Sequence, residues 1–332
     1  MNYIGSKHKL NPWILETISS VISMPLQETV FCDLFAGTGA VGRNFKTLVK
    51  RVIANDIEFY SYILLQNYIG NHKPLDFEKF IKELNELPGK KGFVFENYSE
   101  GGSAGRLYFS EENGKKIDAM RTQIENWKNG NVIDQSLYYF LLASLIESAD
   151  KVANTASVYG AYLKKIKKSA EKPLVLQPAI FETTENSHLV FQADANLLIK
   201  EIEGDILYLD PPYNARQYGA NYHLLNTIAK YDTFVPQGKT GLRSYEKSSY
   251  CKKGEVAKSF EALIADAQFK FVFLSYNNEG LMSQKEVETI MKRYGTYTLK
   301  TKKYQRFKAD KTTSRNHKAD ATVEYLHILE KQ

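Results

Sequence analysis

Residues 206–213 read Ile206-Leu207-Tyr208-Leu209-Asp210-Pro211-Pro212-Tyr213, an apolar run that ends in an acid, two prolines and an aromatic ring. A short apolar run of this kind predicts a buried strand of a parallel sheet. Open α/β sheets carry their functional sites at the carboxyl ends of such strands. The stretch therefore predicts both a strand and a site at its end.

Similar apolar runs, rich in β-branched and aromatic residues, recur along the chain and end in polar, Gly or Pro residues. They lie at residues 30–35, 52–55, 189–192 and 271–275. Helical patterns at 59–69 and 221–230 alternate with these strands. Strands that alternate with helices predict an α/β fold with a doubly wound, mostly parallel sheet.

A long insertion separates the second and third of these strands. Residues 74–186 far exceed the roughly 30 residues of a βαβ crossover, so they predict an inserted domain within a discontinuous domain of 1–73 and 187–332. The insertion reads as mainly helical, with patterns at 116–127, at 135–150 and in a lysine-rich third stretch. Apolar runs around its Gly-rich segment suggest a hairpin or a loop.

Composition limits the function classes. The 332 residues are 43% hydrophobic, enough for a sizeable core, and the net charge of +6 suits a polyanionic partner. No signal peptide or membrane span is evident, so we expect a cytoplasmic protein without a membrane partner. Cys32 and Cys251 have no metal-ligand spacing, and we expect reduced thiols and no metal.

A glycine turn follows the first strand, in Asp33-Leu34-Phe35-Ala36-Gly37-Thr38-Gly39. Glycines there let a ligand approach the backbone closely. The lysine that a phosphate-binding loop requires is absent after Gly39, which disfavours nucleoside triphosphates. Asp56 ends the second strand, where a carboxylate can accept hydrogen bonds from both ribose hydroxyls of NAD or S-adenosylmethionine. Alternatively, Asp56 only caps the next helix.

The acid and prolines at 210–213 suit chemistry on an exocyclic amine. The lone pair of such an amine is delocalised into its ring, so an enzyme must hold both N–H bonds with acceptors. The Asp210 carboxylate and the Pro211 carbonyl can do this and stabilise the developing positive charge. Tyr213 would stack on a base swung out of the duplex, whereas an ordinary turn is the alternative for the motif.

In content and order the chain resembles the Dam-type, or alpha-group, DNA adenine-N6 methyltransferases, including those that accompany type II restriction endonucleases. The resemblance rests on Asn2-Tyr3-Ile4-Gly5-Ser6-Lys7, the Asp33–Gly39 loop, Asp56, the insertion and Asp210–Tyr213. It implies a seven-stranded S-adenosylmethionine-dependent methyltransferase sheet whose final antiparallel pair includes residues 304–307 and 322–329. It also implies that 74–186 is a target-recognition domain and that Asp210, Pro211, Pro212 and Tyr213 are catalytic.

The same resemblance implies a cofactor site in the N-terminal segment, in the glycine turn and at two strand ends. Its residues would be Tyr3, Gly5, Lys7, Asp33, Phe35, Ala36, Gly37, Thr38, Gly39, Asp56, Ile57, Asp194 and Ala195. Lys7 would face the cofactor carboxylate and Asp33 its amino group, while Phe35 would line the pocket. Asp194 would contact its adenine, unless it is only an exposed acid at a helix start.

Double-stranded DNA is the expected partner, and residues 214–256 the expected DNA-contacting region of the catalytic domain. Cations, aromatics and polar side chains interleave as on nucleic-acid surfaces, within this region and in the lysine-rich stretch at 161–170. The expected contacts are Lys164, Lys165, Arg216, Gln217, Tyr218, Arg243 and Tyr245. A solvated loop and the wet face of a helix are the alternatives for the two basic stretches.

The expected function is transfer of a methyl group from S-adenosylmethionine to the N6 amine of a flipped adenine. We expect a monomer that can function alongside a cognate restriction endonuclease. The alternatives are an RNA or cytosine-N4 methyltransferase, a catalytically inactive DNA-binding homologue, and a dinucleotide oxidoreductase. An oxidoreductase leaves Asp210-Pro211-Pro212-Tyr213 unexplained, and intact Asp210 and Tyr213 oppose an inactive homologue.

Overall fold

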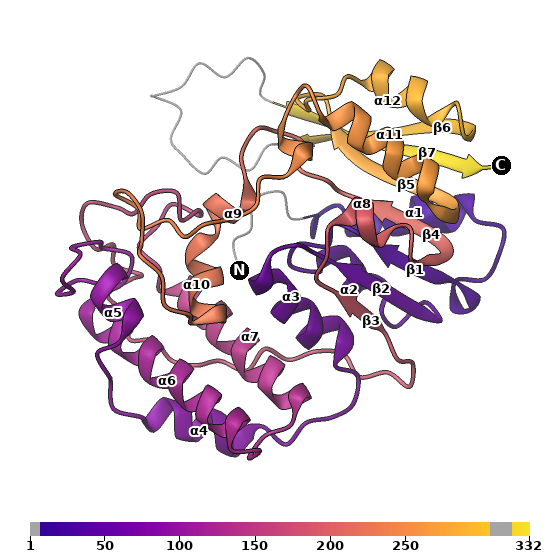
Figure 1. Cartoon of the computed structure of the whole chain (residues 1–332). Helices are drawn as coiled ribbons and strands as arrows, with labels where there is room; N and C mark the ends of the chain where they lie inside the picture. The colour runs from indigo at the N-terminus through magenta and orange to yellow at the C-terminus, as the bar shows by residue number, and fades with distance from the viewer. Residues whose placement is uncertain (1–6, 306–320) are drawn as a thin grey trace. The chain divides into compact units, whose positions relative to one another are not determined.

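The computed structural model describes residues 7–305 and 321–332, and these divide into two compact units (Figure 1). Within the described residues, the sheet unit comprises 7–57, 186–217, 247–305 and 321–332. The helical unit is built from two further segments, 58–185 and 218–246. The chain therefore leaves the sheet unit twice, after residue 57 and after residue 217.

The sheet unit contains a seven-stranded sheet in the order β3-β2-β1-β4-β5-β7-β6. Its strands are β1 (Val30–Asp33), β2 (Arg51–Asn55), β3 (Leu189–Phe191), β4 (Glu203–Leu209), β5 (Gln268–Asn277), β6 (Gly295–Gln305) and β7 (Ala321–Lys331). The first five are mutually parallel, and β7 runs antiparallel to both β5 and β6. This order confirms the predicted doubly wound α/β fold, including its antiparallel final pair.

Alternating side chains on these strands build two apolar layers. On one face Phe31 stacks on Phe45, the last residue of α2 (Ala40–Phe45), with ring centroids 4.0 Å apart. On the other face, buried residues such as Cys32 and Leu207 join a cluster with three helices. These are α8 (Ala195–Leu198), α11 (Val256–Asp266) and α12 (Gln284–Met291). The central strands are buried on both faces, which explains why they read as continuous apolar runs.

The sheet ends in strands of very different length. β3 has three residues, whereas β6 has eleven and begins well before the predicted residue 304. Polar and charged residues interrupt the apolar alternation of β6, so its sequence signal is weak. Lys300, Lys302 and Lys303 on this outer strand are exposed, and the Lys302 amine lies 5.7 Å from the centre of the Trp13 ring. The predicted residues 306 and 307 lie outside the described part of the chain.

The helical unit has its own apolar core. Its helices are α3 (Phe59–Leu65), the π-helical turn η2 (Gln66–Gly70), α4 (Glu78–Glu86), α5 (Phe93–Tyr98), α6 (Glu111–Asn129), α7 (Gln135–Lys151), α9 (Tyr218–Asn221) and α10 (His223–Lys230). α3 and α10 both pack on α7 and share its buried cluster. The helices predicted at 116–127 and 135–150 are confirmed as parts of α6 and α7.

Within the insertion, the Gly-rich segment 99–105 is a loop, one of its two predicted alternatives, whereas the hairpin alternative and the third predicted helix are wrong. The run 93–95 lies in helix α5, because the buried Asp118 carboxylate accepts hydrogen bonds from the Val94 and Phe95 backbone N–H groups at 2.9 and 2.7 Å and so caps this helix. Residues 161–170 form turns and irregular structure, so their lysines lie on a loop. They lack the apolar spacing that would hold a helix against a core.

The observed division also differs in extent from the predicted 74–186 insertion, because α3, α9 and α10 belong to the helical unit. Tyr60 N–H donates to the Asn226 side chain at 2.9 Å, which ties α3 to α10 across the chain. Cys32 and Cys251 are both buried as free thiols. Among the described residues, no helix combines the length and apolarity that crossing a membrane requires.

Candidate active site

The order of the sheet reverses between β1 and β4, and this reversal brings the sequence motifs together. Asp33 pairs with Tyr208 in the register of these parallel strands, and the Leu34 N–H donates to the Tyr208 carbonyl at 3.2 Å. Asp210 follows Tyr208 by two residues, so the glycine turn and the acid-proline motif leave the sheet side by side. Ligands of doubly wound sheets bind at such reversal points.

The glycine turn has a backbone shape that few other residues adopt. Gly37 and Gly39 have φ values of +54° and +76°, which an L side chain disfavours. The Ala36 N–H donates to the Asn55 carbonyl at 2.9 Å, and the Gly37 N–H donates to the Asp56 carboxylate at 2.9 Å. Helix α3 begins with Glu58 as its N-cap. Asp56 therefore orders the glycine turn, while Glu58 occupies the N-cap position of α3.

Asp33 is almost completely buried at the end of β1. Its carboxylate accepts a hydrogen bond from the Gly42 N–H at 2.9 Å, in the first turn of α2. Burial raises the pKa of Asp33 to about 7, against the Gly42 hydrogen bond and with the help of the charges on Asp210 and Asp56. Three carboxylates thus converge near the turn, and together they suit a cationic ligand.

Asn55, which the sequence did not single out, holds two strand ends together. Its buried side-chain amide donates to the carbonyls of Leu34 and Ala193, both at 3.1 Å, and its side-chain oxygen accepts from the Ala193 N–H. Asp194 follows directly, is exposed, and caps α8 by accepting hydrogen bonds from Asn196 and Leu197 N–H groups. A helix-capping role for Asp194 is thus present, and it leaves a ligand contact open.

An aromatic contact closes this side of the turn. The partly buried Phe35 ring meets the Tyr250 ring edge to face, with centroids 4.9 Å apart. Tyr250 is buried, and its hydroxyl donates to the Asn196 side chain at 2.8 Å. The polar sequence around Tyr250 had suggested a nucleic-acid surface, but this tyrosine belongs to the core of the sheet unit.

Lys7, which we expected to face a cofactor carboxylate, lies against the Asp210–Tyr213 motif. Its amine is 3.2 Å from Asp210 Oδ1, 3.7 Å from Glu324 Oε2 and 5.8 Å from the centre of the Tyr213 ring. Burial disfavours its charge, yet the Asp210 and Glu324 carboxylates hold the pKa of Lys7 above its usual value. Tyr3 and Gly5, the other expected residues of this segment, lie outside the described part of the chain.

The backbone of the motif is also held in place. The Leu281 N–H donates to the Tyr213 carbonyl at 3.0 Å, and Pro211 is buried. Within the described part of the chain, no group donates a hydrogen bond to the Pro211 carbonyl. Burial raises the pKa of Asp210 to about 6, Lys7 lowers it and Glu324 raises it. Asp210 is therefore mostly ionised at neutral pH and can accept a hydrogen bond.

The expected DNA contacts differ widely in exposure. Lys164, Lys165 and Arg216 are exposed. Gln217 exchanges hydrogen bonds with the Ser248 backbone, accepting from its N–H at 2.9 Å. In the helical unit, the half-buried Tyr218 stacks on a neighbouring ring. The polar loop also places Tyr245 half-buried in this unit.

Arg243 is a structural residue of the helical unit. It is 8% exposed, donates two hydrogen bonds to the Asp232 carboxylate at 3.0 and 2.8 Å, and lies 4.8 Å from the centre of the Phe234 ring. Its donors are thereby committed within its own loop. We therefore withdraw Arg243 from the expected phosphate contacts.

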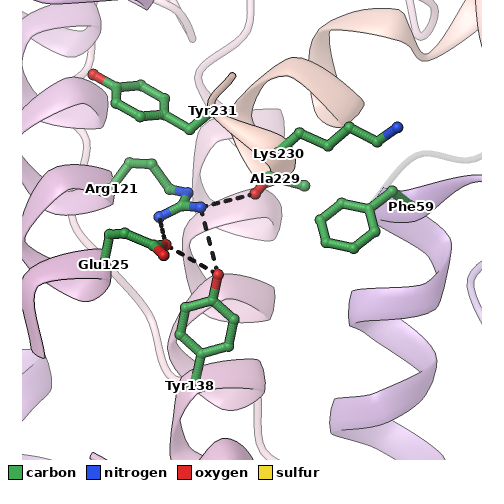
Figure 2. A pocket seen from close by; sticks show the side chains of 7 residues that line it. All are labelled: Phe59, Arg121, Glu125, Tyr138, Ala229, Lys230 and Tyr231. Atoms are coloured by element: carbon green, nitrogen blue, oxygen red, sulfur yellow. Dashed lines mark hydrogen bonds and ion pairs between the residues drawn. The ribbon is translucent and has the colours of Figure 1, made fainter. Parts of the chain in front are cut away.

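Figure 2 shows a pocket of about 360 Å³ that is lined only by residues of the helical unit. Arg121 dominates its wall and donates to the Ile228 and Ala229 carbonyls at the end of α10, both at 3.1 Å. It also donates to the Glu125 carboxylate at 2.7 Å. The guanidinium thus caps α10 and ties it to α6. Among the described residues, no group of three or more His, Cys, Asp or Glu side chains could hold a metal ion.

Comparison with known proteins agrees with this arrangement. Residues 3–290 match the family model of the D12 class N6 adenine-specific DNA methyltransferases. The chain belongs to this family. It is an adenine-specific DNA methyltransferase by membership, which excludes the oxidoreductase and disfavours the RNA and cytosine-N4 alternatives.

Two relatives extend the similarity over the full chain. The type II methyltransferase M.NlaIII of Neisseria lactamica is 63% identical over 332 residues, covering 100% of this chain and 99% of that protein. The type II methyltransferase M.FokI of Planomicrobium okeanokoites is 40% identical, and its alignment covers 100% of this chain but 53% of the longer relative. Among solved structures, the putative RNA methyltransferase PH1948 from Pyrococcus horikoshii aligns with 98% of this chain and with 83% of the PH1948 chain. The two chains share 10% sequence identity, and their TM-score of 0.31 is too low to support an argument.

Proposed function

We propose that this enzyme uses S-adenosylmethionine to methylate the N6 amine of an adenine flipped out of double-stranded DNA, at the site formed by Asp210–Tyr213 and the glycine turn. The observation that carries the proposal is the pairing of β1 with β4, which makes the Asp33 and Asp210 strand ends neighbours. A methyl donor bound at one end and an amine bound at the other would then meet.

The residues at the turn fit S-adenosylmethionine, which supplies an electrophilic methyl group on a sulfonium. Its positive charges suit the acidic surroundings of Asp33, and its ribose hydroxyls suit the Asp56 carboxylate. Ala36, Thr38, Ile57 and Ala195 would line the same site next to these acids. Gly37 and Gly39 would admit the ligand close to the backbone, while Phe35 would contribute an apolar wall.

Chemistry on the target amine falls to the four residues of the motif. The ionised Asp210 carboxylate and the Pro211 carbonyl would each accept one N–H bond, which turns the nitrogen lone pair toward the methyl group. Pro212 stiffens the peptide because its ring fixes φ. Tyr213 would stack on the extruded base and offset part of the few kcal/mol needed to unstack it.

DNA binding would use the exposed cations Lys164, Lys165 and Arg216, which can contact phosphates. Gln217, Tyr218 and Tyr245 stay in this proposal as DNA contacts. A target-recognition role for the helical unit is also part of it. We expect a monomer that works in the cytoplasm, where an enzyme of this class meets its DNA.

The named relatives are type II methyltransferases. By analogy, this enzyme would protect DNA from a cognate restriction endonuclease. Extracts of a host that expresses the methyltransferase would then yield DNA resistant to that endonuclease.

A direct test incubates the protein with radiolabelled S-adenosylmethionine and unmethylated genomic DNA, followed by nucleoside analysis. We expect label in N6-methyladenine, and Asp210→Ala should lose this label while still binding the cofactor. Asp205→Asn is the matched control, because Asp205 lies on the same strand and only accepts a hydrogen bond from the Val30 N–H. Label in RNA or cytosine, or full turnover by Asp210→Ala, would contradict the proposal.

A further inference from the structure

Glu324 is a buried acid that neither the motifs nor the cofactor site requires. It lies in β7, paired in register with Asn277, the last residue of β5. Because β7 runs antiparallel, its beginning reaches the same edge of the sheet as the end of β4. Glu324 is 8% exposed, and burying an ionised carboxylate is costly unless it has a partner.

The partner of Glu324 is Lys7, but their contact is incomplete. Lys7 Nζ and Glu324 Oε2 are 3.7 Å apart, which is longer than an ordinary hydrogen bond. Within the described residues, Glu324 Oε2 has no hydrogen-bond partner. Lys7 is instead closer to Asp210, at 3.2 Å. One buried ammonium is thus shared unequally between two carboxylates.

This arrangement raises a difficulty for the proposed methyl transfer. Asp210 must accept an N–H bond of the target amine, yet the stronger, charged donor of Lys7 already contacts its Oδ1. Asp210 Oδ2 can also accept a hydrogen bond, but a neutral amine can replace the ammonium at Oδ1 only if the ammonium has another anion to bind. A movement of about 1 Å would bring Lys7 to the 2.7–2.9 Å range of a charge-assisted hydrogen bond with Glu324.

We propose that Glu324 is a positioning residue for methyl transfer, which receives the Lys7 ammonium when the target amine binds Asp210. The proposal rests on the function inferred above. Before the amine binds, Lys7 fixes the position of the Asp210 carboxylate. Once the amine has replaced Lys7 at Asp210, Glu324 compensates the charge of the Lys7 ammonium. No covalent step is involved, since only hydrogen bonds exchange.

The charges around Asp210 make the proposal measurable. Lys7 faces it from the N-terminal segment, Glu324 from β7, Asp33 from β1, and the Tyr208 and Tyr213 hydroxyls belong to its own strand and loop. Glu324 raises the pKa of Asp210 and Lys7 lowers it. The plot of methylation rate against pH falls on its acid side as Asp210 is protonated. Neutralising Glu324 and neutralising Lys7 should therefore move this acid limb in opposite directions.

The experiment measures single-turnover methylation between pH 5 and 8 with saturating S-adenosylmethionine and DNA. Glu324→Gln should slow transfer by about tenfold and shift its acid limb down by about one pH unit, because Asp210 loses a repelling charge and holds Lys7 more tightly. Lys7→Met should shift the limb up. Cofactor affinity should stay unchanged in Glu324→Gln.

Combining the two changes gives the sharpest outcome. With Lys7 removed, Glu324 only repels Asp210, so adding Glu324→Gln to Lys7→Met should raise the rate, although Glu324→Gln alone lowers it. A simple structural ion pair would not reverse sign in this way. Glu330→Gln, an exposed acid on the same strand, is the control and should match the unmodified enzyme.

Two results would overturn the inference: a Glu324→Gln rate profile equal to that of the unmodified enzyme, or equal effects of Glu324→Gln with and without Lys7. If Glu324→Gln does not fold, Glu324→Asp tests the proposal instead, because it keeps the negative charge but has a shorter side chain. It should slow transfer without moving the acid limb, and normal transfer would refute the proposal. If the unmodified enzyme methylates no adenine, the proposed function itself fails.

Discussion

The Asp56→Ala variant tests the link between the glycine turn and cofactor binding. The Asp56 carboxylate accepts the Gly37 N–H at 2.9 Å, a hydrogen bond to a charged group that contributes about 1.5–3 kcal/mol. Asp56→Ala removes this bond and the proposed ribose contacts, and a loss of about 2–4 kcal/mol corresponds to a roughly 30-fold to 1000-fold weaker affinity. Asp56→Asn keeps a neutral acceptor, so we expect a loss of about tenfold.

Isothermal titration calorimetry with S-adenosylmethionine measures these affinities directly. Asp205→Asn provides the comparison, because it changes an acid at the opposite end of the sheet, on β4. Thermal melting without ligand separates a disordered turn from an unfolded protein. Unchanged affinity in Asp56→Ala, with an unchanged melting temperature, would show that Asp56 neither orders the turn nor binds the ribose.

Two further predictions concern Asp210 and the basic residues. The pKa of Asp210 is raised to about 6, and its carboxylate must be ionised to accept a hydrogen bond. The methylation rate of the unmodified enzyme should therefore fall as the pH drops through 6, to about a tenth at pH 5. A rate that stays constant between pH 5 and 7 would contradict this role of Asp210. Lys164→Ala and Lys165→Ala should each lower the salt dependence of DNA binding by about one ion. Arg243→Ala should leave this salt dependence unchanged and destabilise folding by about 1 kcal/mol. Filter binding at several salt concentrations and thermal melting distinguish these outcomes.

The arrangement of the strands was predictable because each central strand carries a continuous apolar run that ends in polar or turn residues. The order of the motifs along the chain then placed Asp33, Asp56 and Asp210 at strand ends, and the sheet order brings Asp33 beside the Asp210 strand end. The resemblance added the number of strands and the antiparallel final pair. The strands and the motifs at their ends could be predicted because each depends on residues that are close together in sequence.

The contacts that the sequence did not reveal share a different cause. Lys7 meets Asp210 across more than 200 residues, and neither residue type reveals its partner. The helix α5 depends on Asp118, which caps it from α6, and Arg243 is committed by Asp232 within its loop. Such contacts depend on tertiary structure, and pattern reasoning cannot locate them. Glu324 had one available signal, because it is the only acidic residue in the predicted strand 322–329.

The two borders of the sheet are protected against unwanted pairing by different means. An open sheet exposes unpaired backbone groups along its outermost strands, and another chain could add a strand there. The three residues of β3 offer too little length for such an addition. β6 offers eleven, but its exposed lysines would repel an identical strand from a second molecule. The like charges of this long border thus discourage strand-to-strand association between two molecules.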